Sequence, residues 1–254
     1  MSGISRRAWR VWQRNFDVFL QTWHTQITFT VIEPLIVLVA MGFGLGNYVN
    51  LGGGASYLAF LAPGLIAAYA MWGTAAECSW GSFFRMDQQR TFDAMIVTPL
   101  SIEDVITGEV LWGASRAIET TLALMAVFLV FQVPMAFSVF LAVPAMFLMG
   151  VVFAATGLVV VSQVRNVAQL NHFATLFLIP QYMFAGVFFP LDGLPEWAQT
   201  VGWFLPLSHG VNLSRSLVSG TFTPGMLADM VWLLLAAAGM YMLALHKVRE
   251  RLIT

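Results

Sequence analysis

The sequence predicts an all-α, polytopic membrane protein that has six transmembrane helices, an N-terminal amphipathic interfacial helix and a broken re-entrant segment before the last span. Of the 254 residues, 59% are hydrophobic and only 10% are charged, whereas an average soluble domain carries about 25% charged residues. The mean hydropathy is +0.77. The net charge of −1 gives no basic field of the kind that binds nucleic acid. These values exclude a soluble fold and a nucleic-acid partner, and they make membrane lipid the expected surroundings.

The first expected element is an amphipathic N-terminal helix within residues 1–26. Tryptophan, phenylalanine and leucine recur over 5–23 at steps of three and four residues, while arginine and other polar residues cluster on a different face. A helix that carries both Arg and Trp favours the plane of the membrane interface. The segment is therefore either a simple anchor or a gating helix beside a translocation path.

Six apolar stretches follow, each close to the roughly 20 apolar residues that a helix needs to cross a bilayer. They are residues 27–46, 57–76, 106–131, 138–161, 167–190 and 225–245. Ten of the twelve basic residues lie before the first stretch, after the last one, or in connections that face the same side. Of the other two, Arg215 lies on the opposite side and Arg116 lies within the third stretch. Because basic residues concentrate on the cytoplasmic side, we expect both termini there.

Charged residues within the expected spans are functional candidates, because an isolated intramembrane charge costs at least about 2.5–3.5 kcal/mol. Arg116 and Glu119 are three residues apart on one helical face, so we expect them to pair. Glu77 and Glu109 are expected to reach the cytoplasmic surface. Glu33 in the first span has no evident partner, and it keeps a proton-coupled carrier open as an alternative mechanism.

A charged island at residues 83–100 separates the second and third spans. The pattern over 83–97 predicts a short helix, which the residue before Pro99 would end. Ser101 and Asp104 then resemble a capping box that opens the next helix. Since two spans can be joined by far fewer residues, we expect this helix to dock a cytoplasmic subunit. A solvated surface helix without a partner is the alternative.

The segment at 188–215 is too apolar for a solvated loop and too interrupted for a span. Pro190, Pro195 and Pro206 divide it, and Pro195 stands where proline is tolerated at a helix start. We expect two short half-helices that re-enter the outer leaflet. Backbone of this kind must be buried in protein or line a cavity, so the segment should cap a pathway or pack against a partner.

Motifs of ATP hydrolysis and of other enzyme chemistry are absent from the sequence. A P-loop needs Gly-Lys followed by Ser or Thr, but the only lysine, Lys247, follows His246. The chain has no Gly-x-Ser-x-Gly elbow and no His-Glu-x-x-His pair. Its four histidines share no ligand spacing, and its one cysteine, Cys78, is expected to pack as a small apolar residue. We therefore expect neither an enzyme nor a chain that binds a metal or cofactor.

This order of parts resembles the ABC-2 type permeases of ATP-binding-cassette exporters over essentially the whole chain, 1–254, as a single transmembrane domain. One stretch that carries the resemblance is 83–101, which includes Thr-Phe-Asp-Ala-Met-Ile. The other opens with Gly-Val-Phe-Phe-Pro-Leu-Asp-Gly-Leu-Pro at 186–195 and closes with Pro-Leu-Ser-His-Gly at 206–210. Within the family, Phe-Leu-Ala-Pro-Gly-Leu-Ile-Ala-Ala at 60–68 is most similar to the nodulation-factor export permeases of rhizobia, which belong with the lipo-oligosaccharide exporters.

The resemblance implies a homodimer of this chain and two copies of a cytoplasmic ABC ATPase in the bacterial inner membrane. ATP and Mg would bind to the ATPase and not to this chain. The complex would move a lipo-oligosaccharide, a glycolipid or a related amphiphile outward; a drug or lipid exporter of the same family is the alternative. The family's coupling helix corresponds to residues 83–100. The expected ATPase-coupling residues are Arg85, Asp87, Arg90, Phe92 and Asp93.

The family's substrate path runs between the two protomers and is lined by the first, second and fifth spans. The aromatic candidates in these spans are Phe29, Tyr69, Trp72, Phe177 and Tyr182. Aromatic faces stack on sugar rings and also pack on lipid tails. Ordinary lipid-facing or interhelical packing is the simpler explanation of each residue.

Overall fold

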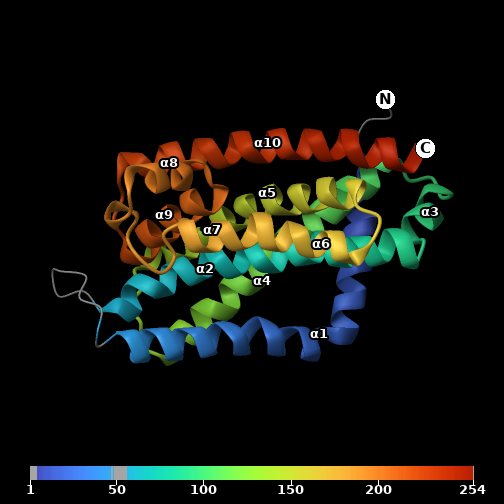
Figure 1. The fold of residues 1–254 in the computed structure, drawn as a ribbon. Helices are drawn as coiled ribbons and strands as arrows, with labels where there is room; N and C mark the ends of the chain where they lie inside the picture. Colours follow the sequence, from blue (N-terminus) through green and yellow to red (C-terminus); the bar gives the residue numbers. More distant parts are fainter. Residues whose placement is uncertain (1–4, 47, 49–55, 254) are drawn as a thin grey trace.

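The computed structural model describes residues 5–46, 48 and 56–253, and it leaves out the side chain of Phe29. This part of the chain is a bundle of helices and contains no strand (Figure 1). The long helices are α1 (Ala8–Val39), α2 (Tyr57–Ala76), α4 (Ile102–Val130), α5 (Ala142–Gln163) and α10 (Pro224–Ile253). The expected all-α class is therefore confirmed.

Within the described residues, five helices are long and apolar enough to cross a membrane. With the π- and 3-10-helical turns that extend them, they are Ala8–Leu45, Tyr57–Gln88, Ile102–Val130, Phe137–Gln163 and Pro224–Ile253. The fifth expected span, 167–190, is not among them. Its helical part consists of α6 (Val167–Phe173), the π-helical η5 (Ala174–Leu178) and α7 (Ile179–Phe184). Polar side chains such as Gln169, Asn171 and Gln181 lower its hydropathy, and a total of six spans stays a prediction.

The N-terminal amphipathic segment and the first span form one continuous helix, α1, which the π-helical η1 (Ala40–Leu45) extends. The expected separation into two helices was wrong, because no glycine or proline interrupts the chain between residues 8 and 33. The helix nevertheless changes direction: its first part crosses the bundle and its second part runs along it (Figure 1). The Thr22 and Thr28 hydroxyls donate to carbonyls four residues earlier, at 3.2 and 2.8 Å. Such bonds often bend helices.

Small residues let α2, α4 and α5 approach closely at the centre of the bundle. A Cβ atom added at Gly150 of α5 would lie 3.0 Å from the Cα atom of Ala114 in α4. Cys78, in the π-helical η2 (Glu77–Gly81), is fully buried beside Gly157, as expected for a small apolar residue. Small residues are favoured where membrane helices meet, because van der Waals contact drives their association in lipid.

The segment at 188–215 contains the two expected short helices, α8 (Glu196–Phe204) and α9 (Pro206–Ser219). Pro206 occupies the first turn of α9, where its missing N–H costs no intrahelical bond. The buried His209 anchors α9, since its Nδ1 lies 2.6 Å from an Asp229 carboxylate oxygen and its Nε2 lies 2.8 Å from the Trp203 carbonyl oxygen. The segment thus contains short helices, of which α9 runs on to Ser219, and their re-entry into the outer leaflet as half-helices stays a prediction.

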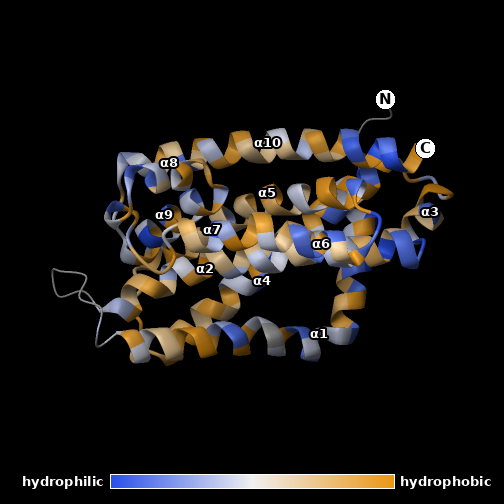
Figure 2. Cartoon of the chain, viewed as in Figure 1, coloured by the Kyte–Doolittle hydropathy of each residue, from blue (hydrophilic) through white to orange (hydrophobic). Residues whose placement is uncertain are grey.

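The start of α1, the end of α10 and the short helix α3 (Thr91–Ile96) meet at one end of the bundle, which we call the α3 end (Figure 1). Arg251 of α10 lies 3.3 Å from Asp87, just before α3. Hydrophilic residues are prominent at this end, while apolar residues dominate the middle of the bundle (Figure 2). Both described ends of the chain therefore lie on the side that carries most of its basic residues.

The charged island is not the single helix that the sequence pattern predicted over 83–97. Instead, α2 continues through η2 and the π-helical η3 (Phe84–Gln88). Arg90 then adopts a φ angle of 51°, in the left-handed region, and α3 begins after it. A non-glycine residue costs roughly 1–2 kcal/mol in this conformation, so packing on either side must hold it there.

The expected capping box at the start of α4 is confirmed. The Ser101 hydroxyl accepts a hydrogen bond from the Asp104 backbone N–H at 3.1 Å, and the Asp104 carboxylate accepts one from the Ser101 backbone N–H at 3.3 Å. The same carboxylate accepts two bonds from Ser5, from its backbone N–H at 2.7 Å and its hydroxyl at 2.9 Å. The cap thus also fixes the chain just before α1 to the start of α4.

Candidate functional site

Two buried side chains hold α3 to the bundle. Phe92 is fully buried and Met95 is 8% exposed, and both belong to a cluster of apolar residues from several other helices. Their partners include Val11 of α1, Val105 of α4, Val161 of α5, Leu170 of α6 and Leu252 of α10. A force applied to α3 would therefore reach most of the helices at the α3 end.

The outward side of this segment is exposed and charged. We call Asp87, Arg90, Asp93 and Val97 the α3 surface; all four are exposed, and Val97 is 88% exposed. Arg90 and Asp93 lie 3.4 Å apart, a surface pair of a kind that contributes at most about 1 kcal/mol. Charges held so weakly remain available to pair with another protein.

The other two expected coupling residues lie inside the chain. Phe92 belongs to the buried cluster, and the Arg85 side chain is only 14% exposed because its guanidinium points into the bundle. In this conformation they can position the α3 surface but cannot offer a partner much surface of their own.

Behind the α3 surface lies a buried charge network made of Glu77, Arg85, Glu109, Arg116 and Glu119. Its three carboxylates and two guanidiniums give a formal charge of −1. Removing such groups from water is costly unless they are paired and hydrogen-bonded. The ion pairs of the network therefore form only while the helices that carry these side chains keep their relative positions.

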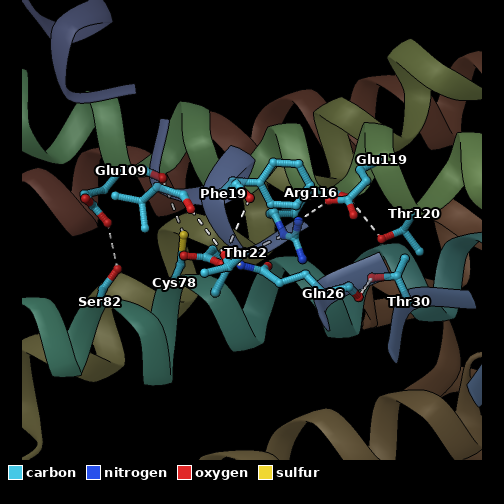
Figure 3. Close-up of polar contacts among 12 residues, drawn as sticks. Phe19, Thr22, Gln26, Thr30, Cys78, Ser82, Glu109, Arg116, Glu119 and Thr120 are labelled. Atoms are coloured by element: carbon cyan, nitrogen blue, oxygen red, sulfur yellow. Dashed lines mark hydrogen bonds and ion pairs between the residues drawn. The ribbon is translucent and has the colours of Figure 1, made fainter. Parts of the chain in front are cut away.

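Arg85 is the centre of this network. Its Nη1 lies 2.7 Å from Oε1 of Glu77, and its Nη2 lies 2.7 Å from Oε2 of Glu109. Glu109 is fully buried, so the expectation that it reaches the cytoplasmic surface was wrong. Asn15 and Ser82 donate to its two carboxylate oxygens at 2.8 and 3.0 Å, and Figure 3 shows Ser82 facing Glu109. The satisfied carboxylate thus ties α1 and the extension of α2 to α4.

A second branch of the network runs along α4. Arg116 and Glu119 form the expected ion pair, which Figure 3 shows beside Phe19 of α1. The guanidinium carbon of Arg116 lies 4.9 Å from the centroid of the Phe19 ring, within the range of a cation–π contact. The Nε of Arg116 also lies 3.9 Å from Oε2 of Glu77. Both branches therefore connect α1, α4 and the end of α2.

Sequence reasoning missed Asn15 and Ser82, although both hold the central carboxylate. Asn15 is 94 residues from Glu109, and Ser82 is 27 residues from it. A carboxylate in an expected span without a neighbouring cation is a signal of distant partners, but Glu109 was expected to reach the cytoplasmic surface instead. The signal could not name the partners, because their approach depends on how the helices pack.

The structure brings together three polar groups farther along the bundle. Tyr69 of α2 lies near Glu33 of α1 and Tyr182 of α7. The Tyr182 ring packs edge-on against Phe188, with 4.9 Å between ring centroids. Glu33 therefore has a tyrosine neighbour that the sequence did not reveal, although its own side chain is exposed.

The remaining path candidates are more dispersed. Trp72 and Phe177 are partly buried against the same apolar core, and Phe177 stacks on Phe173 with 5.5 Å between ring centroids. The side chain of Phe29 lies outside the described part of the chain. Among the path candidates whose side chains the structure describes, Tyr69 and Tyr182 thus lie near one another.

Comparison with known proteins shows the family to which the chain belongs. The profile of the ABC-2 type transporter family matches residues 6–218, which include the α3 surface and the whole charge network. The chain is 35% identical over 210 residues to Nodulation protein J of Rhizobium leguminosarum bv. trifolii, covering 83% of this chain and 80% of the relative. It is 31% identical over 211 residues to Nodulation protein J of Rhizobium meliloti (strain 1021), covering 83% and 80%.

A more distant relative has a name that describes transport. Inner membrane transport permease YadH of Escherichia coli (strain K12) is 24% identical over 202 residues, covering 80% of this chain and 78% of the relative. The family profile and the relatives above 30% identity each span most of the chain. The chain is therefore a multi-pass membrane protein of the ABC-2 type transporter family.

Proposed function

We propose that this chain is the transmembrane permease subunit of an ATP-binding-cassette exporter. It moves a lipo-oligosaccharide, a glycolipid or a related amphiphile outward across the bacterial inner membrane, and a separate ABC ATPase supplies the energy. The observation that carries the proposal is the α3 end, where the exposed, charged α3 surface is backed by Phe92 in a core that several helices share. A small helix built in this way suits the transmission of force from a docked partner.

In this mechanism the ATPase moves α3, and the buried contacts pass the movement on. Phe92 transmits it to the apolar core of the α3 end, and Arg85 transmits it to Glu109 and thus to α4. Asn15 connects the same carboxylate to α1. ATP can shift the permease between two conformations only if the ATPase binds them with different affinity. The distances between the charged groups of the network would differ between those two conformations.

ATP and Mg belong to the partner in this proposal, since the sequence has no Gly-Lys-Ser or Gly-Lys-Thr. We assign no cofactor and no enzymatic activity to this chain. The α3 end faces the cytoplasm, because ten of the twelve basic residues lie on that side. Both termini are then cytoplasmic, residues 83–100 form the coupling region, and residues 188–215 form the re-entrant cap on the outer side.

A homodimer is part of the proposal, and Glu33 supports it. Its exposed side chain shares α1 with Ile32 and Ile36, which are 49% and 58% exposed. In a single copy this carboxylate would face lipid at a cost of at least about 2.5–3.5 kcal/mol. A second copy would cover it and enclose a path next to Tyr69 and Tyr182.

The substrate class is the finer part of the proposal. The resemblance to nodulation-factor export permeases and the relatives that carry the name Nodulation protein J favour an amphiphilic oligosaccharide. Aromatic candidates on the path are able to stack against sugar rings and acyl chains. Export of a drug or another lipid by the same mechanism is the alternative within the family.

A proton-coupled carrier is the second candidate, and Glu33 is the observation that favours it. Its carboxylate lies on an apolar helix near Tyr69, an arrangement able to take up and release a proton. It would need neither an ATPase nor the α3 surface.

Reconstitution into proteoliposomes separates the two candidates. We expect export of a fluorescent glycolipid only when the chain is combined with its cognate ATPase and ATP. The chain alone should hydrolyse no ATP and should move no glycolipid under a pH gradient. Transport by the chain alone under a pH gradient, abolished by Glu33→Gln, would instead establish the carrier.

A further inference from the structure

Arg215 of α9 adjoins a cavity of about 640 Å³ at the end of the bundle opposite the α3 end. The start of α2, the connection after α4 and the end of α9 line this cavity. Among the described residues that line it, Arg215 supplies the only charge, and all the others except Ser219 are apolar: Ala59, Phe60, Pro63, Pro134, Met135, Ala136 and Val218. A cavity with one cation and apolar walls is complementary to an amphiphile that has an anionic head group.

The chain offers Arg215 no counterion. No carboxylate of the described residues pairs with it, and the remaining positions, 1–4, 47, 49–55 and 254, contain no aspartate or glutamate. Burial lowers the pKa of the Arg215 guanidinium to about 10, so the group is still cationic at neutral pH. A buried cation of this kind is expensive unless a negative charge joins it.

The hydrogen bonds of Arg215 leave donors unused. Its Nη2 donates to the carbonyl oxygens of Gly186 and Val187 at 2.5 and 3.4 Å, and its guanidinium carbon lies 3.9 Å from the centroid of the Phe60 ring. The Nε–H is buried and has no hydrogen-bond partner among the described residues. The guanidinium is therefore held in place through Nη2, and Nη1, which makes no hydrogen bond among the described residues and is not fully buried, is the donor left for a ligand.

We propose that the Arg215 cavity binds the anionic head of a phosphate-bearing amphiphile, with the apolar chain of the ligand against Phe60, Pro63 and Met135. A guanidinium matches phosphate oxygens through paired N–H donors. An anionic ligand would also explain why Arg215, unlike most of the basic residues, lies on the side opposite the α3 end. This site does not depend on the ATPase, so a failed docking experiment would leave it untouched.

Native mass spectrometry of the full chain, released from nanodiscs of equal parts phosphatidylglycerol and phosphatidylcholine, tests the site. Wild type should retain phosphatidylglycerol in preference to phosphatidylcholine by about tenfold, as expected for a charge-assisted hydrogen bond. Arg215→Gln should lose that preference, and Arg215→Lys should keep part of it. Arg165→Gln, which removes an exposed arginine at the α3 end, is the matched control and should retain the wild-type preference.

Competition identifies the ligand class and remains informative if Arg215→Gln does not fold. Dodecyl phosphate should displace phosphatidylglycerol from wild type, whereas inorganic phosphate at the same concentration should not, because it lacks a chain for the apolar wall. An unchanged lipid preference in a folded Arg215→Gln variant would overturn the site and leave Arg215 as a clamp on Gly186. Equal displacement by inorganic phosphate would overturn the assignment to an amphiphile.

Discussion

Arg85→Met is expected to destabilise the folded chain by about 3–5 kcal/mol, the usual consequence of removing one partner from a buried ion pair. The variant leaves the carboxylates of Glu77 and Glu109 without their main cation, and Glu109 has no access to water. Thermal unfolding of the purified protein in detergent measures the effect. The exposed Arg165 provides the control, since Arg165→Met should leave the midpoint nearly unchanged.

The double variant Arg85→Met with Glu109→Gln separates loss of charge pairing from loss of packing. Neutralising the orphaned carboxylate should recover part of the lost stability, because coupled residues give non-additive effects. If the single Arg85 variant unfolds at the wild-type temperature, the network does not tie α4 to the end of α2. Strictly additive effects of the two changes would likewise argue against the pairing.

Asp93→Arg is expected to weaken stimulation of the cognate ATPase by about tenfold or more, because reversing a charge at an interface places like charges together. The variant should still fold, since the Asp93 side chain is 53% exposed and its partner Arg90 is 76% exposed. The measurement is ATPase activity of the reconstituted complex as a function of permease concentration. Asp192→Arg is the matched control, because Asp192 is an exposed aspartate at the opposite end.

Equal stimulation by wild type and by a correctly folded Asp93→Arg variant would remove Asp93 from the docking interface. A variant that binds the ATPase normally but no longer exports would instead place Asp93 in transmission of the movement. Measuring complex formation and export separately distinguishes these outcomes.

Local patterns predicted those features whose determinants lie close together in the sequence. The capping box of Ser101 and Asp104 and the ion pair of Arg116 and Glu119 each span three residues, and both formed as expected. The apolar stretches that form α2, α4, α5 and α10 could also be predicted from the sequence, because length and hydropathy alone identify a candidate span. The residues at which each helix begins and ends were harder to predict.

Features set by contacts between distant segments were not predictable in this way. The left-handed conformation of Arg90 interrupts a helical pattern without glycine or proline, because the buried Phe92 and the Asp87–Arg251 pair fix the chain on either side. Likewise, the side-chain partners of Glu109 come from two distant parts of the chain, Asn15 in α1 and the pair Ser82 and Arg85 after α2. The sequence offered the expected coupling residues only as one set, and the structure separates the exposed Asp87, Arg90 and Asp93 from the more buried Arg85 and Phe92.

Cysteine cross-linking at the α3 surface tests the central claim most directly, namely that this end of the permease receives the ATPase. Val97 is 88% exposed at the α3 end, and Phe222 is 68% exposed after α9, at the opposite end. The only native cysteine, Cys78, is buried and should not react. In membranes that contain the complex, Val97→Cys should cross-link to the ATPase, whereas Phe222→Cys should not. Cross-linking at Phe222→Cys, with none at Val97→Cys in an assembled and active complex, would contradict the account.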